Sequence, residues 1–295
     1  MGEPHTATVI GDALIDEVQH PDEVERFVGG AALNLATGLQ ALGISTTLVS
    51  PVGDDEGGRL VQQHLDARGV ALDKLQAPLG TGIARSDRTH GEPTYTFNPA
   101  MLSRTYAFGD AESALVRSTD ITVVNSYPVD RDDQTEELEY LLAEAIGFTA
   151  YDPNPRPTMI GSHGEFLRGF ESIASRVSLV KISSEDAEWM FGSSLDAAIE
   201  QTLAFGAGMV LATAGAGGAA IVTADGIGIA RPIVDLPGPI VDTMGAGDAT
   251  LASLLHRISL HGTDLTAEQW GEHLDFAMEV AARTVRSVGA DIQLP

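Results

Sequence analysis

Apolar residues follow two alternating patterns along most of the chain. Short apolar runs typical of buried strands occur at 7–10, 46–50, 121–125, 149–151, 177–182 and 209–213. Apolar residues at helical spacing occur between or after them, at 31–42, 58–67, 134–146, 185–190 and 195–205, and two more helices close the chain. Strands that alternate with helices predict an α/β fold with a mainly parallel sheet covered on both faces.

Two hairpins interrupt this alternation. The runs 81–88 and 93–97 predict two strands around the turn His90-Gly91, outside the main sheet, because no helix separates them. The runs 219–223 and 227–231 flank Asp225-Gly226 in the same way. The first of these hairpins could form a lid.

The segment 241–260 combines small residues, an acid and a helical pattern. Apolar side chains recur at helical spacing at Leu251, Leu254, Leu255 and Ile258, which predicts a helix beginning at about Gly247 or Asp248. The unpaired N–H groups of a first turn bind anionic oxygen, and small residues there let a ligand approach the backbone. A carboxylate beside such a site can accept a proton from a hydroxyl. From these residues alone, Asp248 is equally well an ordinary first-turn acid.

Composition narrows the class of partner. A net charge of −25 and a pI near 4.4 argue against nucleic acid and against anionic membrane as partners. Cysteine is absent, no signal peptide is visible at residues 1–8, and no apolar window is long enough to span a membrane. We therefore expect a cytoplasmic protein. Loops at Gly11, Gly53, Asp152 and Gly215 each follow a strand, so we expect them to gather at the ligand-binding rim of the sheet.

Several common site motifs are missing from the sequence. The sequence has two lysines, Lys74 and Lys181, and neither follows the glycine-rich loop of a phosphate-binding P-loop. No strict dinucleotide-binding fingerprint follows a strand. The histidines form no His-Glu-x-x-His pattern, and no Gly-x-Ser-x-Gly elbow occurs. A dinucleotide-dependent oxidoreductase would share the α/β pattern but would need that fingerprint.

Six short motifs follow one another along the chain. Two of them are Gly29-Gly30-Ala-Ala-Leu-Asn34 and Asp242-Thr-Met-Gly-Ala-Gly-Asp248, and the other four lie at 11–16, 52–58, 213–219 and 286–290. In this order they resemble the motifs of the ribokinase (PfkB) family of sugar and nucleoside kinases, the first two being similar to its first and second signatures. The resemblance covers nearly the whole chain and implies one domain over residues 1–295, a ribokinase-like three-layer α/β sandwich with a mainly parallel central sheet. It also implies a small β lid made by segments at about 13–29 and 80–106.

The resemblance also implies an activity and a site. It implies transfer of a phosphoryl group from ATP to a sugar hydroxyl, with Asp248 as the base and the N–H groups of Gly245, Ala246 and Gly247 holding the transferred group. The residues that it implies for the sugar are Asp16, Gly29, Gly30, Asn34 and Arg156, and those for the nucleotide are Thr213, Gly215, Gly218 and Lys181. For Asn34 the alternative is a polar residue on a helix face, and for Asp16 a solvated loop acid.

The loop from Asp152 to Arg156 is similar to an Asp-Pro-Asn-x-Arg run of the fructokinase and 2-keto-3-deoxygluconate kinase branch. Its arginine could hold a phosphate or a sugar acid, or be an ordinary surface residue. Arg85 and Arg104 are weaker candidates for the same role.

Two positions concern metal ions. Many members of the family have Asn-x-x-Glu near magnesium, where this chain has Ser183 to Asp186. Asp186 is thus a candidate ligand of Mg²⁺ through water, and helix capping by Ser183 or Ser184 is the alternative. Asp242, with the turn at Gly289, is a candidate neighbour of a monovalent cation such as K⁺.

We therefore expect an ATP-dependent kinase of a small carbohydrate, fructokinase-like or a keto-sugar kinase. The alternatives are a nucleoside kinase of the adenosine type and a non-catalytic sugar-binding paralogue. The exposed edge expected for the lid would suit a homodimer.

Overall fold

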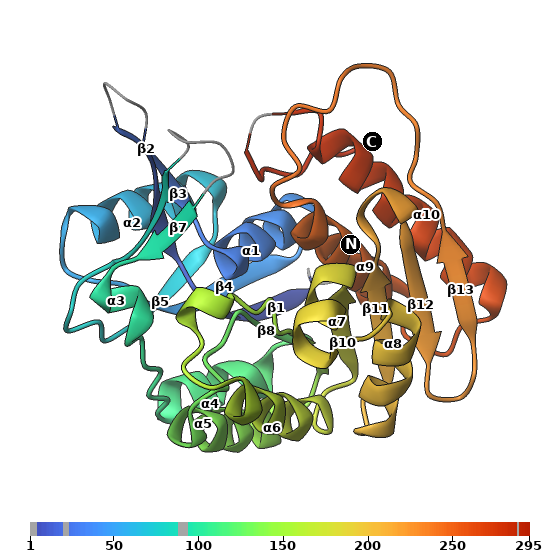
Figure 1. The fold of residues 1–295 in the computed structure, drawn as a ribbon, viewed down its shortest axis with the longest axis horizontal. Coiled ribbons are helices and arrows are strands. Elements are labelled where there is room, and N and C mark those ends of the chain that lie inside the picture. The colour runs from blue at the N-terminus through green and yellow to red at the C-terminus, as the bar shows by residue number, and fades with distance from the viewer. Residues whose placement is uncertain (1–4, 20–23, 88–93, 288) are drawn as a thin grey trace.

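The fold is built on one large sheet with helices on both faces (Figure 1). The computed structural model describes residues 5–19, 24–87, 94–287 and 289–295. Within these residues the large sheet has nine strands in the order β13-β12-β11-β10-β9-β8-β1-β4-β5. Its strands are β1 Thr6–Gly11, β4 Ser45–Pro51, β5 Ala71–Leu75, β8 Ile121–Asn125, β9 Phe148–Asp152, β10 Leu179–Ser183, β11 Met209–Thr213, β12 Ala219–Thr223 and β13 Gly228–Arg231.

Strand direction explains where polar residues gather. The pairs from β5 through β11 are parallel, and β12 and β13 form the antiparallel end of the sheet. Parallel strands buried on both faces are nearly continuous in apolar residues, as β8 is. The polar residues at their carboxyl ends therefore lie together along one edge.

Helices cover the two faces of the large sheet. Buried residues of four helices share one core with the sheet: α1 Ala31–Ala41, α2 Glu56–Arg68, α9 Ala246–His261 and α10 Ala267–Thr284. The core on the other face contains buried residues of α4 Asp110–Ser118, α5 Asp132–Glu144, α6 His163–Ala174, α7 Ser184–Phe191 and α8 Leu195–Ala204. The predicted α/β sandwich with helices on both faces is thus confirmed. Among the described residues no helix is long and apolar enough to cross a membrane.

A second, smaller sheet stands beside the carboxyl edge of the first (Figure 1). Its four strands have the order β3-β2-β6-β7, and they are β2 Leu14–Gln19, β3 Val24–Gly29, β6 Gly82–Asp87 and β7 Thr94–Phe97. The short helix α3, Pro99–Leu102, packs below it. The strands of the small sheet thus come from two parts of the chain, on either side of α1, β4, α2 and β5 in the sequence.

Some elements differ from the sequence prediction. Strands β2 and β3 were not predicted from an apolar pattern, because polar residues such as Asp16, Glu17 and Arg26 occupy many of their positions. Strand β5 and helices α3, α4 and α6 were not predicted, and α9 begins one or two residues earlier than expected, at Ala246. The turn His90-Gly91 lies outside the described residues.

Candidate functional site

A row of polar side chains lies at the carboxyl ends of the central strands. In the strand register, Gly11 of β1 is opposite Asn125 of β8, and Asn125 is opposite Asp152 of β9. Asn125 and Asp152 are completely buried, and Lys181 of β10 is nearly so. Burying polar groups costs free energy unless they form hydrogen bonds or ion pairs. A row of buried polar side chains therefore indicates a candidate functional site at this edge of the sheet.

Asp248 lies near this row, in the first turn of α9. Asn34, in the second turn of α1, donates a hydrogen bond from Nδ2 to Asp248 Oδ2 over 3.4 Å. Burial raises the pKa of Asp248 to about 7, and the negative charge of Asp152 adds to this, whereas Lys181 and Asn34 act in the opposite direction. A carboxyl group with this pKa can both take and release a proton near neutral pH.

The start of α9 has the geometry of an anion site. Gly245 is the N-cap with φ 76°, and the Ala246 N–H donates to the carbonyl of Thr243 over 3.3 Å. Within the described part of the chain, the N–H groups of Gly247 and Asp248 donate no hydrogen bond to the protein. These two unpaired donors, at the positive end of a helix of 16 residues, can hold anionic oxygen.

Lys181 brings a positive charge to the same place. Its Nζ lies 3.1 Å from Asp152 Oδ2 and 4.0 Å from Asp186 Oδ2. A Cβ added to Gly247 would lie 3.5 Å from this nitrogen, so the ammonium group sits against the backbone of the helix start. Burial alone would lower the pKa of Lys181, but the negative charges of Asp152 and Asp186 outweigh this effect. The pKa of Lys181 therefore lies above its usual value, and the side chain stays charged.

Asp186 is engaged in a capping box. Ser183 Oγ accepts the N–H of Asp186 over 3.0 Å, and Asp186 Oδ2 accepts the N–H of Ser183 over 2.8 Å. The capping alternative for Ser183 is therefore observed at the start of α7. One carboxylate oxygen of Asp186 has no hydrogen-bond partner within the described residues.

Asp16 faces the main sheet from the small one. Burial raises the pKa of Asp16 to about 6, the charge of Asp12 adds to this, and Arg156 lowers it. A Cβ added to Gly29 would lie 2.1 Å from Asp16 Oδ2, and one added to Gly30 would lie 2.6 Å from the carbonyl oxygen of Asp12. The absence of a side chain at Gly29 and Gly30 thus lets Asp16 and the Asp12 carbonyl approach their backbone. Gly30 also has a positive φ of 117°, which glycine adopts easily.

Asp12 was not among the predicted site residues. It directly follows β1, is 6% exposed, and accepts the N–H of Ala32 at the start of α1 over 3.1 Å. Burial raises its pKa, and the charges of Arg104 and Arg156 lower it. The positive charges of both arginines therefore act on Asp12, although neither arginine forms an ion pair within 4 Å among the described residues.

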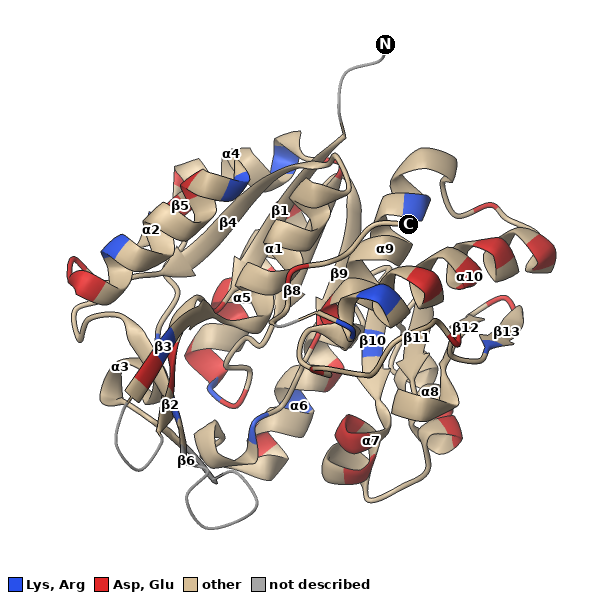
Figure 2. Ribbon diagram, turned by 90° about the horizontal axis from the view of Figure 1, so that it is seen from above, with Lys and Arg blue, Asp and Glu red and all other residues tan. Residues whose placement is uncertain are grey.

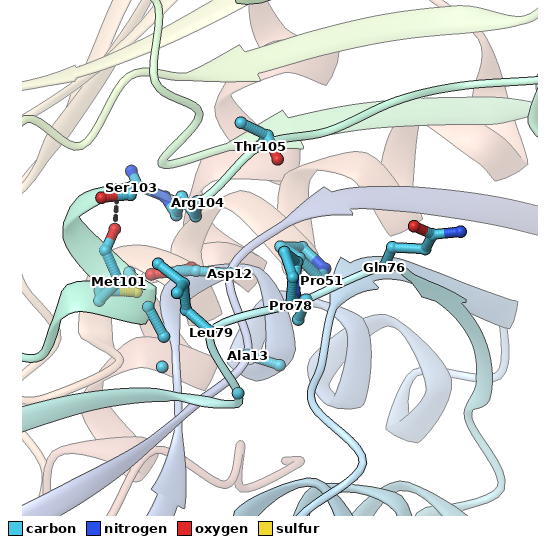
Figure 3. Close-up of a pocket in the computed structure, with 14 residues that line it drawn as sticks. Asp12, Ala13, Pro51, Gln76, Pro78, Leu79, Met101, Ser103, Arg104 and Thr105 are labelled. Atoms are coloured by element: carbon cyan, nitrogen blue, oxygen red, sulfur yellow. Dashed lines mark hydrogen bonds between the residues drawn. The ribbon is translucent and has the colours of Figure 1, made fainter.

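Two pockets adjoin these arginines. The larger is an open cleft of about 450 Å³ whose lining includes Asp12, Gln76, Met101 and Arg104 (Figure 3). The smaller, of about 250 Å³, is lined by Arg104 and Arg156 and by the two non-glycine residues with positive φ, Ser126 and Asn154. Neither pocket includes Asp248.

Arg104 is held by two backbone carbonyls. Its Nη1 donates to Met101 and its Nη2 to Ser126, while Nε is buried without a partner in the described structure. Arg85, the other weaker candidate, instead pairs with Glu17 on the small sheet. Acidic residues outside the site lie on helices such as α5 and α10 (Figure 2).

The glycine loop after β11 lies along the same edge. Gly215–Gly217 forms a short 3-10 turn, and Thr213 accepts a hydrogen bond from Ser184 of α7 over 3.5 Å. A Cβ added to Gly218 would lie 2.1 Å from the carbonyl oxygen of Arg231. Near α9, Asp242 Oδ1 accepts the N–H of Met244 over 2.9 Å, so its carboxylate shapes the loop before Gly245.

Comparison with known proteins agrees with this arrangement. Residues 5–295 match the family described as "pfkB family carbohydrate kinase". An ATP-dependent 6-phosphofructokinase of Thermoanaerobacterium thermosaccharolyticum is 26% identical over 97% of this chain and 89% of its own length. A fructokinase of Klebsiella pneumoniae is 27% identical over 97% of this chain and 95% of its own. The crystal structure of aminoimidazole riboside kinase from Salmonella enterica, with aminoimidazole riboside and an ATP analogue, has a TM-score of 0.79 and 25% identity over 99% of this chain and 97% of that one.

The fold is ribokinase-like. The chain belongs to the pfkB family of carbohydrate kinases, which are ATP-dependent phosphotransferases.

Proposed function

We propose that this protein transfers the γ-phosphoryl group of ATP to a hydroxyl of a small carbohydrate, with Asp248 as the base. The observation that carries the proposal is the pairing of a carboxylate of pKa about 7 with two unpaired helix N–H groups beside it. Asp248 takes the hydroxyl proton while the hydroxyl oxygen bonds to phosphorus and the bond to ADP breaks. The N–H groups at Gly245, Ala246 and Gly247 stabilise the transferred group, with Gly247 the best placed because Ala246 also bonds to Thr243.

The acceptor would be bound between the small sheet and the main sheet. Asp16 and Asn34 offer hydrogen-bonding groups for hydroxyls, and Gly29 and Gly30 keep the backbone accessible. The small sheet would act as a lid that excludes water during transfer. Asn34 has a second task in this proposal, because its amide also orients Asp248.

The pair Arg104 and Arg156 favours a fructokinase-like or keto-sugar acceptor. Among the residues that the structure describes, neither arginine forms an ion pair within 4 Å, although the protein carries a net charge of −25. Ser126 and Asn154 beside them adopt positive φ, which costs free energy and recurs at ligand sites. A carbonyl, carboxylate or phosphate on the sugar would complete this pocket.

ATP would lie along the edge from Lys181 to the glycine loop. Lys181 stays protonated and can contact the phosphates, and Thr213, Gly215 and Gly218 offer a close backbone for the nucleotide. The free oxygen of Asp186 fits water-mediated Mg²⁺, which would neutralise phosphate charge when bound. Asp242 and the backbone near Gly289 would neighbour a monovalent cation such as K⁺.

A substrate panel tests the proposal. Fructose, ribose, 2-keto-3-deoxygluconate and adenosine are each incubated with ATP and magnesium, with and without potassium, and ADP release is measured. Turnover on a sugar that is lost in Asp248→Asn supports the proposal. Turnover on adenosine alone would identify a nucleoside kinase, and sugar binding without ADP release would identify a non-catalytic paralogue.

The small sheet also suits a homodimer. Strand β3 is at its edge, and Val24 and Phe27 on that strand are 52% and 49% exposed. An unpaired edge with exposed apolar side chains favours association with a second copy. Light scattering should give twice the monomer mass for the wild type and a lower mass for Phe27→Glu; a monomeric wild type would refute the dimer.

A further inference from the structure

The segment after α10 passes between three helices of the same face. Ile292 packs against α1, where a Cβ on Gly38 would lie 3.4 Å from its Cγ2. The Gln293 N–H donates to Thr284 Oγ1 at the end of α10 over 3.3 Å. We call residues 289–293 the C-terminal strap.

One ion pair ties the strap to α2. Arg68, in the last turn of α2, donates from Nε and Nη2 to the two oxygens of Asp291, over 3.1 and 2.5 Å. This two-point geometry holds a carboxylate in a fixed orientation. The hydrogen bond from Arg68 is the main reason why the pKa of Asp291 lies below its usual value.

The neighbouring strap residue touches the start of α9. A Cβ on Gly245 would lie 2.5 Å from Ala290 Cβ and 2.8 Å from its Cα. Ala290 therefore fills the space beside the N-cap whose left-handed conformation aims the following N–H groups. The loop before Gly245 is tied to the end of α10 as well, since the N–H of Val241 donates to the carbonyl of Val285 over 2.8 Å.

We propose that Arg68 is a positioning residue for phosphoryl transfer, because it fixes Asp291 and thereby holds Ala290 against the N-cap Gly245. Arg68 acts only through the strap and does not belong to the groups assigned to substrate or nucleotide. The expected effect on kcat rests on the proposed function, whereas the contact between the strap and Gly245 does not.

The kinetic test compares Arg68→Gln with a matched control. Arg117→Gln breaks a similarly exposed pair with Glu144, between α4 and α5 on the opposite face of the sheet. An exposed ion pair has a modest effect, so we expect Arg68→Gln to lower kcat by about twofold to fivefold with an unchanged acceptor KM. The control should keep the kcat of the wild type, and the charge exchange Arg68→Asp with Asp291→Arg should recover most of the loss.

Hydrogen exchange gives a readout that does not need activity. In Arg68→Gln, amides of 241–248 should exchange faster than in the wild type, and in Arg117→Gln they should not. Equal kcat and equal exchange in Arg68→Gln and the wild type would overturn the proposal, as would equal losses in the two variants. A wild type that phosphorylates no acceptor would refute the proposed function, and exchange alone would then decide the role of Arg68.

Discussion

Replacing Asp248 with asparagine should stabilise the protein in a way that depends on pH. Burial and the charge of Asp152 raise the pKa of Asp248 from 3.8 to about 7. The folded protein therefore holds this proton more tightly than the unfolded chain does. The stability that follows is present below pH 3.8 and is lost as the pH rises through about 7. Asparagine has nearly the same shape and cannot ionise, so the variant escapes this loss.

The size of the effect follows from the pKa. At about 1.4 kcal/mol per pH unit, the full shift corresponds to an upper bound of about 4 kcal/mol. Asp248 is partly exposed, so solvent reduces this, and we expect about 2 kcal/mol. Because part of the shift lies below pH 5, the stability of Asp248→Asn should rise by about 1.3 kcal/mol relative to the wild type between pH 5 and pH 8, or about 3 to 5 °C in Tm.

Thermal unfolding of both proteins at pH 5, 6, 7 and 8 measures this difference. Glu17→Gln is the control, because the hydrogen bond from Arg85 keeps the pKa of Glu17 below its usual value of 4.5. Its contribution is complete above pH 4.5 and disappears only as the pH falls, so its difference from the wild type should stay constant over this range. A constant difference for Asp248→Asn as well would refute the reasoning that the surroundings of Asp248 in the folded protein raise its pKa.

Three further changes test other parts of the site. In the wild type the acceptor KM should fall as the pH rises through about 6, the pKa of Asp16. The variant Asp16→Asn should raise this KM about tenfold and flatten its pH profile. Initial rates measured at several pH values check both expectations. Lys181→Gln should lose about 3 to 5 kcal/mol of stability in urea unfolding, because a buried carboxylate loses its partner, whereas Lys74→Gln at an exposed pair should lose under about 1 kcal/mol. Gly245→Ala should lower kcat more than tenfold, because the added Cβ would collide with Ala290 of the C-terminal strap. Gly262 has a similar φ of 71° and open space around it, so Gly262→Ala should change only Tm. Equal kcat values in the two glycine variants would contradict this prediction.

Local patterns predicted the frame of the fold well. Apolar runs followed by helical spacing marked most strands of the parallel sheet, because these strands are buried on both faces. Strands β2 and β3 show no apolar run, because β3 is largely exposed to solvent and β2 contains the partly or fully buried acids Asp16 and Glu17. Strand β5 shows none either, as an edge strand with Asp73 and Lys74.

The site was less predictable because its contacts are distant in sequence. Asn34 and Asp248 are 214 positions apart, and no local pattern relates them; only the resemblance to a family placed both in one site. Asp12 and Asn125 looked like residues that end strands, and their burial became visible only in the fold. For Asp186, by contrast, the capping alternative was readable from Ser183 three residues earlier.

The central claim is that Asp248 takes a proton from a sugar hydroxyl at a helix start that binds phosphoryl oxygen. Its most direct test is the pH profile of kcat for ADP release with the best sugar of the panel, in the wild type and in Asp248→Asn. The wild-type rate should rise with pH and level off above about 7, and the variant should be slower by about 100- to 10,000-fold at pH 8. A variant that keeps the rate and the pH profile of the wild type would contradict the claim.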